Sequence, residues 1–171
     1  MRRRCRMRWE PLPTRFAVAE MRRGVRLAVD VGMTRVGVAR SDVEGILATP
    51  VETVTRDDLA VDRVIAIAGD LNVTEIFVGL PLSLSGAHTG STEDAIDFAR
   101  QLAGQTDASI RLVDERLTTV SAHSALRQSG KQPSRSRSVV DQVAAVMLLQ
   151  HALDSERSQG VVPGLIVDDV N

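Results

Sequence analysis

The sequence predicts a mixed α/β fold with a five-stranded sheet flanked by α-helices. Three short apolar segments, at residues 26–31, 36–41 and 46–54, come first and are separated by turns, so we expect three antiparallel strands. Two further apolar segments alternate with amphipathic stretches, which is typical of parallel crossover units. Apolar residues make up 43% of the 171 residues and charged residues 25%, so disorder over most of the chain is excluded.

The first two predicted strands form a hairpin. Residues 26–31 (RLAVDV) are rich in β-branched side chains, residues 32–35 turn the chain, and residues 36–41 return it. Pro50 lies in the third predicted strand and cannot donate a ladder hydrogen bond, which indicates an edge strand or a bulge.

Helices and strands then alternate. Residues 55–58 offer a start for a first helix, whose apolar residues recur at helical spacing up to Leu71. Residues 75–80 (EIFVGL) predict a buried strand, and the loop at 81–90 is followed by a cap signal at 91–94 for a second helix. The order is completed by a strand at 110–115, a helix at 120–128 and a longer helix at 138–155.

We expect one folded domain at residues 25–157, a disordered basic extension at 1–24 and a tail at 158–171. Residues 1–26 hold nine arginines and two glutamates, a formal +7, which leaves about −8 on the other 145 residues. No apolar segment of the length found in a secretory signal follows the N-terminal arginines, and none approaches the length of a membrane span, so we expect a cytoplasmic protein with no membrane partner. The single Cys5 excludes a disulfide framework and a multi-cysteine zinc site.

The composition limits how this chain could bind nucleic acid. Aromatic residues make up 2%, which excludes binding by stacking bases on aromatic platforms. The acidic body therefore needs a local basic strip or bridging cations. Such a strip occurs at residues 127–137, although a solvated loop is the alternative; its basic residues, which could contact phosphates without reading sequence, are Arg127, Lys131, Arg135 and Arg137.

Acidic residues stand at three places where an apolar element begins or ends. Asp30 ends the first strand, Asp114 and Glu115 end a later one, and Asp141 lies in the first turn of the last predicted helix. Carboxylates that converge in a buried place repel one another, and all-oxygen ligation favours Mg²⁺ or Mn²⁺ as the remedy. Two such ions can activate a water and stabilise the leaving oxygen of a phosphodiester.

Each acid also has a purely structural explanation. Asp30 could accept hydrogen bonds in the following turn. Glu115 could pair with Arg111 or Arg116, and the spacing from Ser138 to Asp141 could be only a helix-start box. The joint placement of the three acids favours the metal site over these separate roles.

Four segments resemble the YqgF family of the RNase H-like superfamily. Residues 30–39 (DVGMTRVGVA) are similar to its D-x-G-x-x-R-x-G-V-A hairpin, and residues 79–81 (GLP) with two later glycines are similar to its G-L-P loop. Residues 114–119 (DERLTT) and 141–150 match its D-E-R-L-T-T block and its closing helix. The resemblance covers residues 25–155 and implies an RNase H-like fold. Members are described as Holliday-junction resolvases and as nucleases that mature the 5′ end of pre-16S rRNA.

The resemblance implies that Asp30, Glu115 and Asp141 are catalytic acids that hold two Mg²⁺ or Mn²⁺ ions. Asp114 is a further candidate ligand, but side chains alternate along a strand, so only one of the adjacent acids should face Asp30, and we favour Glu115. We expect phosphates to be held by Arg35, Arg116 and the basic strip. The loop that shapes the substrate mouth is expected to use Gly79, Pro81, Gly86 and Gly90.

The expected function is metal-dependent hydrolysis of phosphodiester bonds in branched DNA, in precursor rRNA, or in both. A non-catalytic ribosome-assembly or nucleic-acid-binding factor is an alternative, and it would bind without Mg²⁺ and release no product. An actin-like ATPase fragment is another, because Asp-x-Gly-x-Thr also resembles the phosphate-binding hairpin of that class. Junction resolution would require two opposed active sites, hence a homodimer, through residues 161–167 or the last helix.

Overall fold

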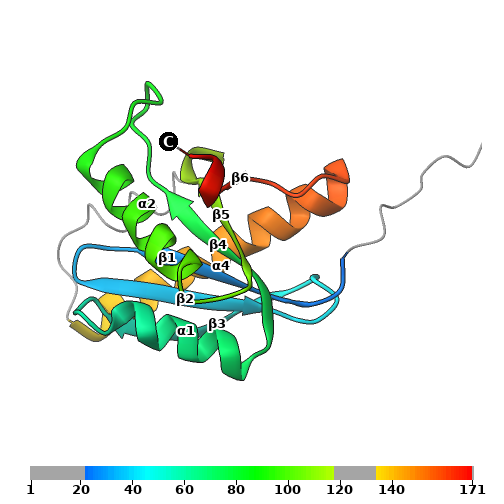
Figure 1. The fold of residues 1–171 in the computed structure, drawn as a ribbon, viewed down its shortest axis with the longest axis horizontal. Helices are drawn as coiled ribbons and strands as arrows, with labels where there is room; N and C mark the ends of the chain where they lie inside the picture. Colours follow the sequence, from blue (N-terminus) through cyan, green and yellow to red (C-terminus); the bar gives the residue numbers. More distant parts are fainter. Residues whose placement is uncertain (1–21, 118–133, 171) are drawn as a thin grey trace, which may run out of the picture.

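The computed structural model describes residues 22–117 and 134–170, with the backbone alone for residues 117 and 134–140, and it confirms the mixed α/β class. One six-stranded sheet has the order β3-β2-β1-β4-β5-β6 (Figure 1). The strands are β1 (Val25–Val31), β2 (Arg35–Ser41), β3 (Ala48–Thr55), β4 (Val73–Leu80), β5 (Ser109–Asp114) and β6 (Leu165–Ile166). The helices are α1 (Ala60–Asp70), α2 (Gly90–Ala103) and α4 (Ser134–Gln159), with short 3₁₀ turns η1 (Glu115–Leu117) and η2 (Val167–Asp169).

The strand directions follow the predicted pattern. β1, β2 and β3 form an antiparallel meander, and β4 and β5 run parallel to β1. The register between β2 and β3 shifts between Val38 and Ala39, where Ala39 pairs with Pro50, so the predicted edge or bulge at this proline is confirmed. α1 and α2 are the crossovers that lead into β4 and β5.

The predicted strand count of five is wrong by one. β6 lies in the segment interpreted as a tail and pairs antiparallel with Arg111 and Leu112 of β5. Gly164, with φ at +86°, turns the chain into this strand, and the following Val167 is buried in the core at 2% exposure. A two-residue strand is too short to show an alternating pattern in the sequence. β6 forms because its backbone pairs with the edge strand β5 and because the following Val167 is buried.

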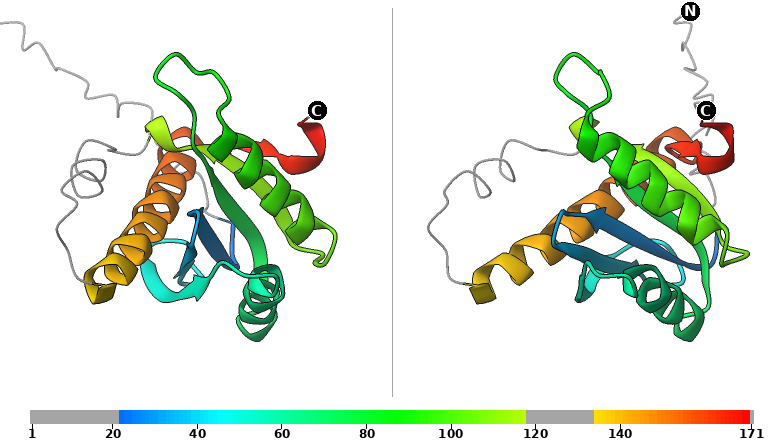
Figure 2. Two further views of the ribbon diagram at one scale, coloured as in Figure 1. Left: turned by 90° about the vertical axis from the view of Figure 1, so that its left-hand side faces the viewer. Right: turned by 60° about the vertical axis from the view of Figure 1, so that its left-hand side comes forward.

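Helices cover both faces of the sheet. Figure 2 shows α4 on one face and α1 with α2 on the other. In β1 the side chains alternate, so that Leu27 and Val29 pack toward α1 and α2 while Ala28 lies in the cluster with α4. The next residue on the α4 side is Asp30. None of the helices in the described ranges combines the length and the apolar character that a membrane span requires.

Two helix starts differ from those predicted. α2 begins at Gly90 rather than after Ser91, because Thr89 is its N-cap and forms a reciprocal capping box with Thr92. α4 begins at Ser134, so Asp141 lies two turns inside the helix and the predicted first-turn position is wrong. The helix expected at residues 120–128 lies outside the described residues.

A partly buried ionic cluster joins the start of β1 to the sheet and to the end of α4. Arg22 donates to Glu156 and to Glu75, both at 2.7 Å, and Arg111 donates to Glu75 at 2.8 Å. Arg26 is 1% exposed beside the same two glutamates. Arg22 lies within the extension expected at residues 1–24, yet it is bonded to the folded domain.

Candidate active site

Asp30 lies near the middle of the sheet and is 5% exposed. It is paired with Gly37 of β2 across the hairpin. On the other side, the last pair between β1 and β4 joins Val29 to Val78, so the next residues along these parallel strands are Asp30 and Gly79. Asp30 therefore has a glycine on each side, on the face of the sheet that α4 covers.

Gly79 leaves room for the carboxylate of Glu115. A Cβ built on Gly79 would overlap Glu115 Oε1 and would lie 3.3 Å from the Glu115 Cδ and Cγ atoms. Neighbouring strands are about 4.8 Å apart, so this carboxylate lies beside Asp30. The missing side chain of Gly79 thus brings together two acids that are far apart in the sequence.

Gly37 serves in the same way for Asp141. A Cβ on Gly37 would overlap the Asp141 carbonyl oxygen and would lie 2.6 Å from its carbonyl carbon. The backbone of α4 therefore crosses the sheet in direct contact with the strand position paired with Asp30. Asp30 and Asp141 lie on the same side of the sheet, and Glu115 approaches from the other neighbour of Asp30.

Asp114 takes a different partner. Its carboxylate accepts from Arg116 Nη2 at 2.6 Å, Nε at 3.0 Å and the backbone N–H at 2.9 Å. The hydrogen bonds from this guanidinium hold the pKa of Asp114 below its ordinary value. Arg116, expected to contact phosphates, also reaches the Ser83 carbonyl at 3.5 Å and so connects the end of β5 to the loop after β4. This arrangement favours Glu115 over Asp114 as the acid near Asp30.

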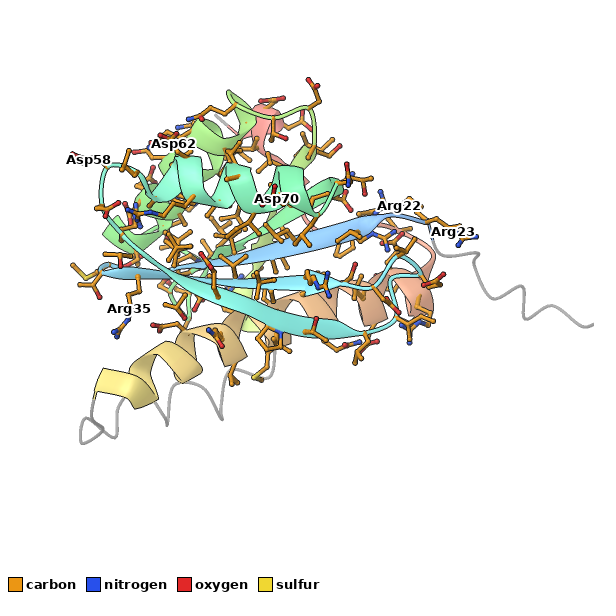
Figure 3. The ribbon with its side chains drawn as sticks, turned by 90° about the horizontal axis from the view of Figure 1, so that it is seen from below. Arg22, Arg23, Arg35, Asp58, Asp62 and Asp70 are labelled. Carbon is orange, nitrogen blue, oxygen red and sulfur yellow. The ribbon has the colours of Figure 1, made fainter. Side chains whose placement is uncertain are left out.

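Arg35 pairs with Asp141. Its Nε donates to Asp141 Oδ2 at 2.9 Å, and both side chains are partly exposed. Figure 3 shows Arg35 at the end of the hairpin, beside α4, and Arg22 at the opposite end of the sheet. The guanidinium therefore contributes a positive charge beside Asp141.

The donor set fits a hard divalent cation in its chemistry, because Asp30, Glu115 and Asp141 offer carboxylate oxygens only. Within residues 22–117 and 134–170, however, no group of three or more acidic, histidine or cysteine side chains is gathered closely enough to hold a metal ion. The Asp141 carboxylate is turned toward Arg35. Binding of a cation by all three acids would therefore require Asp141 to exchange its partner.

Arg56 fixes the turn that follows Asp30. Its Nη1 donates to the Gly32 carbonyl at 3.1 Å, and both Nη groups bond Asp94 of α2, at 2.9 and 2.7 Å. The guanidinium lies 4.9 Å from the ring centroid of Phe98. The hairpin turn is thereby joined to α2.

The predicted loop residues have separate local roles. Gly79 belongs to β4 rather than to the loop. Gly86 has φ at +83° and lies close to Arg116 Nη1, whereas a Cβ on Gly90 would meet nothing within 4 Å. Ser83 bonds Gly86 and Ala87 and so closes the loop on itself. The substrate contacts expected of Pro81 and these glycines stay a prediction.

The predicted basic strip covers residues 127–137. Arg127 and Lys131 lie outside the described residues, and so do the side chains of Arg135 and Arg137 at the start of α4.

Sequence reasoning missed the roles of Gly37 and Arg56. The signal for Gly37 was present, since a glycine inside an apolar strand indicates a close approach by another backbone, and hairpin pairing sets it opposite Asp30. Arg56 had no such signal, because its partners come from a turn and from a helix 38 residues away.

Similarity to known proteins extends over most of the chain. A family model, RuvX, described as Holliday junction resolvase, matches residues 24–155. A relative from Leifsonia xyli subsp. xyli, named "Putative pre-16S rRNA nuclease", is 60% identical over 146 residues, which cover 84% of this chain and 94% of that protein. A relative of the same name from Clavibacter michiganensis subsp. michiganensis is 56% identical over 150 residues, covering 86% and 93%.

A solved structure supports the fold. "T. thermophilus RuvC in complex with Holliday junction substrate" matches with a TM-score of 0.56 and 13% identity, covering 83% of this chain and 99% of that chain. The predicted RNase H-like architecture is confirmed by this likeness.

Proposed function

The chain belongs to the RuvX family of Holliday junction resolvases, and from this premise we propose that Asp30, Glu115 and Asp141 hold the divalent cations of its cleavage site. The family and the names of its relatives make the chain a nuclease, a hydrolase of phosphodiester bonds. The proposal concerns which residues carry the reaction, which cofactor they use and which nucleic acid they act on.

One observation carries the proposal: the two strand positions beside Asp30 are glycines, and each makes room for an element that bears another acid. Gly79 admits the Glu115 side chain and Gly37 admits the α4 backbone at Asp141. Glycine weakens a strand interior, so two of them around one buried acid need a reason. Bringing three carboxylates to one face of the sheet supplies that reason.

Each acid has a distinct part. Asp30, on the central strand β1, would contribute oxygens on both sides, toward Glu115 and toward Asp141. Divalent cations bound there, Mg²⁺ or Mn²⁺ and in our proposal two, supply activation of a water and stabilisation of charge on the leaving oxygen. Glu115 and Asp141 would each hold one of the two cations together with Asp30. Asp114 instead holds Arg116 and, through it, the loop after β4.

We propose structured nucleic acid as the substrate. The family description points to four-way DNA junctions and the names of the relatives point to precursor 16S rRNA, so both are tested. Arg35 and Arg116 lie at the same end of the sheet as the acids and would hold phosphates, together with the strip at residues 127–137. Such contacts position the backbone without reading bases, so recognition by shape is expected.

The test is a side-by-side cleavage assay. It offers a four-way DNA junction, a linear duplex and a precursor 16S rRNA fragment, each with Mg²⁺, Mn²⁺ or EDTA. We expect cleavage with either metal ion and none with EDTA, and Asp30→Asn should abolish product while it retains binding. Product formed in EDTA, or by the Asp30→Asn variant at matched purity, would contradict the assigned acids.

Junction resolution further implies two active sites in a symmetric dimer. Val161 and Leu165, at the C-terminal end, are 66% and 61% exposed and are available for such a contact. We expect a dimer mass by light scattering at assay concentration. A strict monomer that still cleaves would favour precursor rRNA as the substrate.

A further inference from the structure

The ion pair of Arg35 and Asp141 involves a side chain that the proposed cations need. Arg35 Nε donates to Asp141 Oδ2 at 2.9 Å. Side-chain exposures of 29% and 22% leave the pair in reach of solvent and of a ligand. The fold brings the two residues together, because Gly37, two residues after Arg35 on the same face of β2, is in contact with the Asp141 backbone.

Arg35 and a divalent cation would compete for the same carboxylate. Both are positive, so they repel each other at the short separation that a shared carboxylate imposes. An arginine released from Asp141 is, however, well suited to a phosphate, because the planar guanidinium matches phosphate oxygens with paired donors. The backbone of a nucleic acid next to the acids offers such oxygens.

We propose that Arg35 is an internal counter-ion of Asp141 that moves to a phosphate of the nucleic acid when a cation takes its place, so that cation and nucleic acid bind cooperatively. This inference rests on the proposed function, since it takes Asp141 as a cation ligand. Coupling between two ligands is reciprocal, so nucleic acid raises the affinity for the cation by the same factor as the cation raises the affinity for nucleic acid. Without nucleic acid, Arg35 would lower cation affinity and so restrain the empty site.

The test measures binding rather than turnover. Ca²⁺ affinity is determined by titration calorimetry for the full chain, with and without a four-way DNA junction, and a gel checks that the junction stays intact. For the wild type, we expect the junction to tighten Ca²⁺ binding roughly 5- to 10-fold, at the low end of usual coupling factors. Arg35→Gln should bind Ca²⁺ alone several-fold more tightly than the wild type and should lose most of the coupling.

Arg40→Gln is the matched control. Arg40 is exposed on the same strand, at a position that alternates to the opposite face from Arg35. Its removal takes away the same formal charge and should leave both Ca²⁺ affinity and coupling unchanged. Arg35→Lys provides a second variant: it keeps the positive charge beside Asp141 but lacks the paired donors, so Ca²⁺ affinity alone should stay near the wild type while coupling falls.

The outcomes separate this inference from the proposed function. Equal Ca²⁺ affinity and equal coupling in the wild type and Arg35→Gln would overturn the inference, and so would weaker Ca²⁺ binding by that variant, because Arg35 would then position Asp141 for the cation. A wild type that cleaves in EDTA would instead overturn the proposed function. Melting curves of each variant show that a loss of coupling comes from a folded protein.

Discussion

Gly79→Ala should disable the site while leaving the fold intact. The added Cβ would overlap Glu115 Oε1 and lie 3.3 Å from Cδ and Cγ, closer than the optimal carbon separation of about 3.5–4.0 Å. The side chain of Glu115 has to give way, since the strand backbone at Gly79 is held by its pairing with Val113 of β5. Relief of the overlap moves the carboxylate by roughly 1 Å, and a displacement of that size costs on the order of 100-fold in rate.

The assay is single-turnover cleavage in Mg²⁺ under saturating enzyme, with thermal unfolding measured on the same preparations. Stability should fall by only about 0.5–1.5 kcal/mol, the usual cost of one distorted side-chain rotamer. Gly69→Ala is the control, because a Cβ there meets nothing within 4 Å, and it should cleave like the wild type.

A double variant tests whether displacement of Glu115 causes the loss of rate in Gly79→Ala. If Gly79→Ala acts by displacing Glu115, then adding it to Glu115→Gln should lower the rate no further, because effects on one functional unit are not additive. The reasoning is refuted if Gly79→Ala cleaves at the wild-type rate, or if the two losses multiply in full.

Three further predictions concern stability and the neighbouring acids. Gly37→Ala should lower the unfolding free energy in urea by about 1–3 kcal/mol, because its Cβ meets the Asp141 backbone rather than a flexible side-chain tip. Burial alone would raise the pKa of Glu156, but hydrogen bonds and charges from its arginine partners hold it below the ordinary 4.5. The ionised Glu156 carboxylate therefore stabilises the fold in full above pH 4.5, and this stabilisation is lost as the pH falls through the lower pKa of the folded state. In this acid range the urea midpoint of Glu156→Gln should depend less on pH than that of the wild type. Asp114→Asn should retain cleavage in the same assay, whereas a loss of rate as large as that of Glu115→Gln would assign Asp114 to the cations. Hydrogen exchange should show less protection in the loop after β4, since Arg116 loses its carboxylate partner.

The elements with a strong apolar pattern were predictable from the sequence. The edge strand β6 and the residues at which helices begin were not. The segment at residues 26–31 has the composition of a buried strand, and its observed pairing follows from the turn after it. β6 depends on hydrogen bonds to an edge that only the folded sheet provides. Similarly, α2 begins earlier than predicted because Thr89 and Thr92 form its capping box in place of the usual Ser and Glu.

Asp30, Glu115 and Asp141 could be proposed as one site from the sequence, but the way in which the fold brings them near one another could not. These three acids were identified from predicted strand and helix boundaries, of which the one at Asp141 is wrong, and from the family resemblance. Their approach depends on Gly37 and Gly79, whose neighbours are set by strand register and by the passage of α4 over the sheet. Pairing of Asp114 with Arg116 is local in sequence, yet the choice between Glu115 and Asp114 required the face of the strand to be known.

Anomalous diffraction from crystals grown with Mn²⁺ tests the central claim most directly, with the same preparation shown to cleave substrate in Mn²⁺. We predict an anomalous peak about 2.0–2.2 Å from an oxygen of Asp30 and in contact with Glu115 or Asp141. Active protein whose Mn²⁺ peaks lie away from Asp30 would contradict the account.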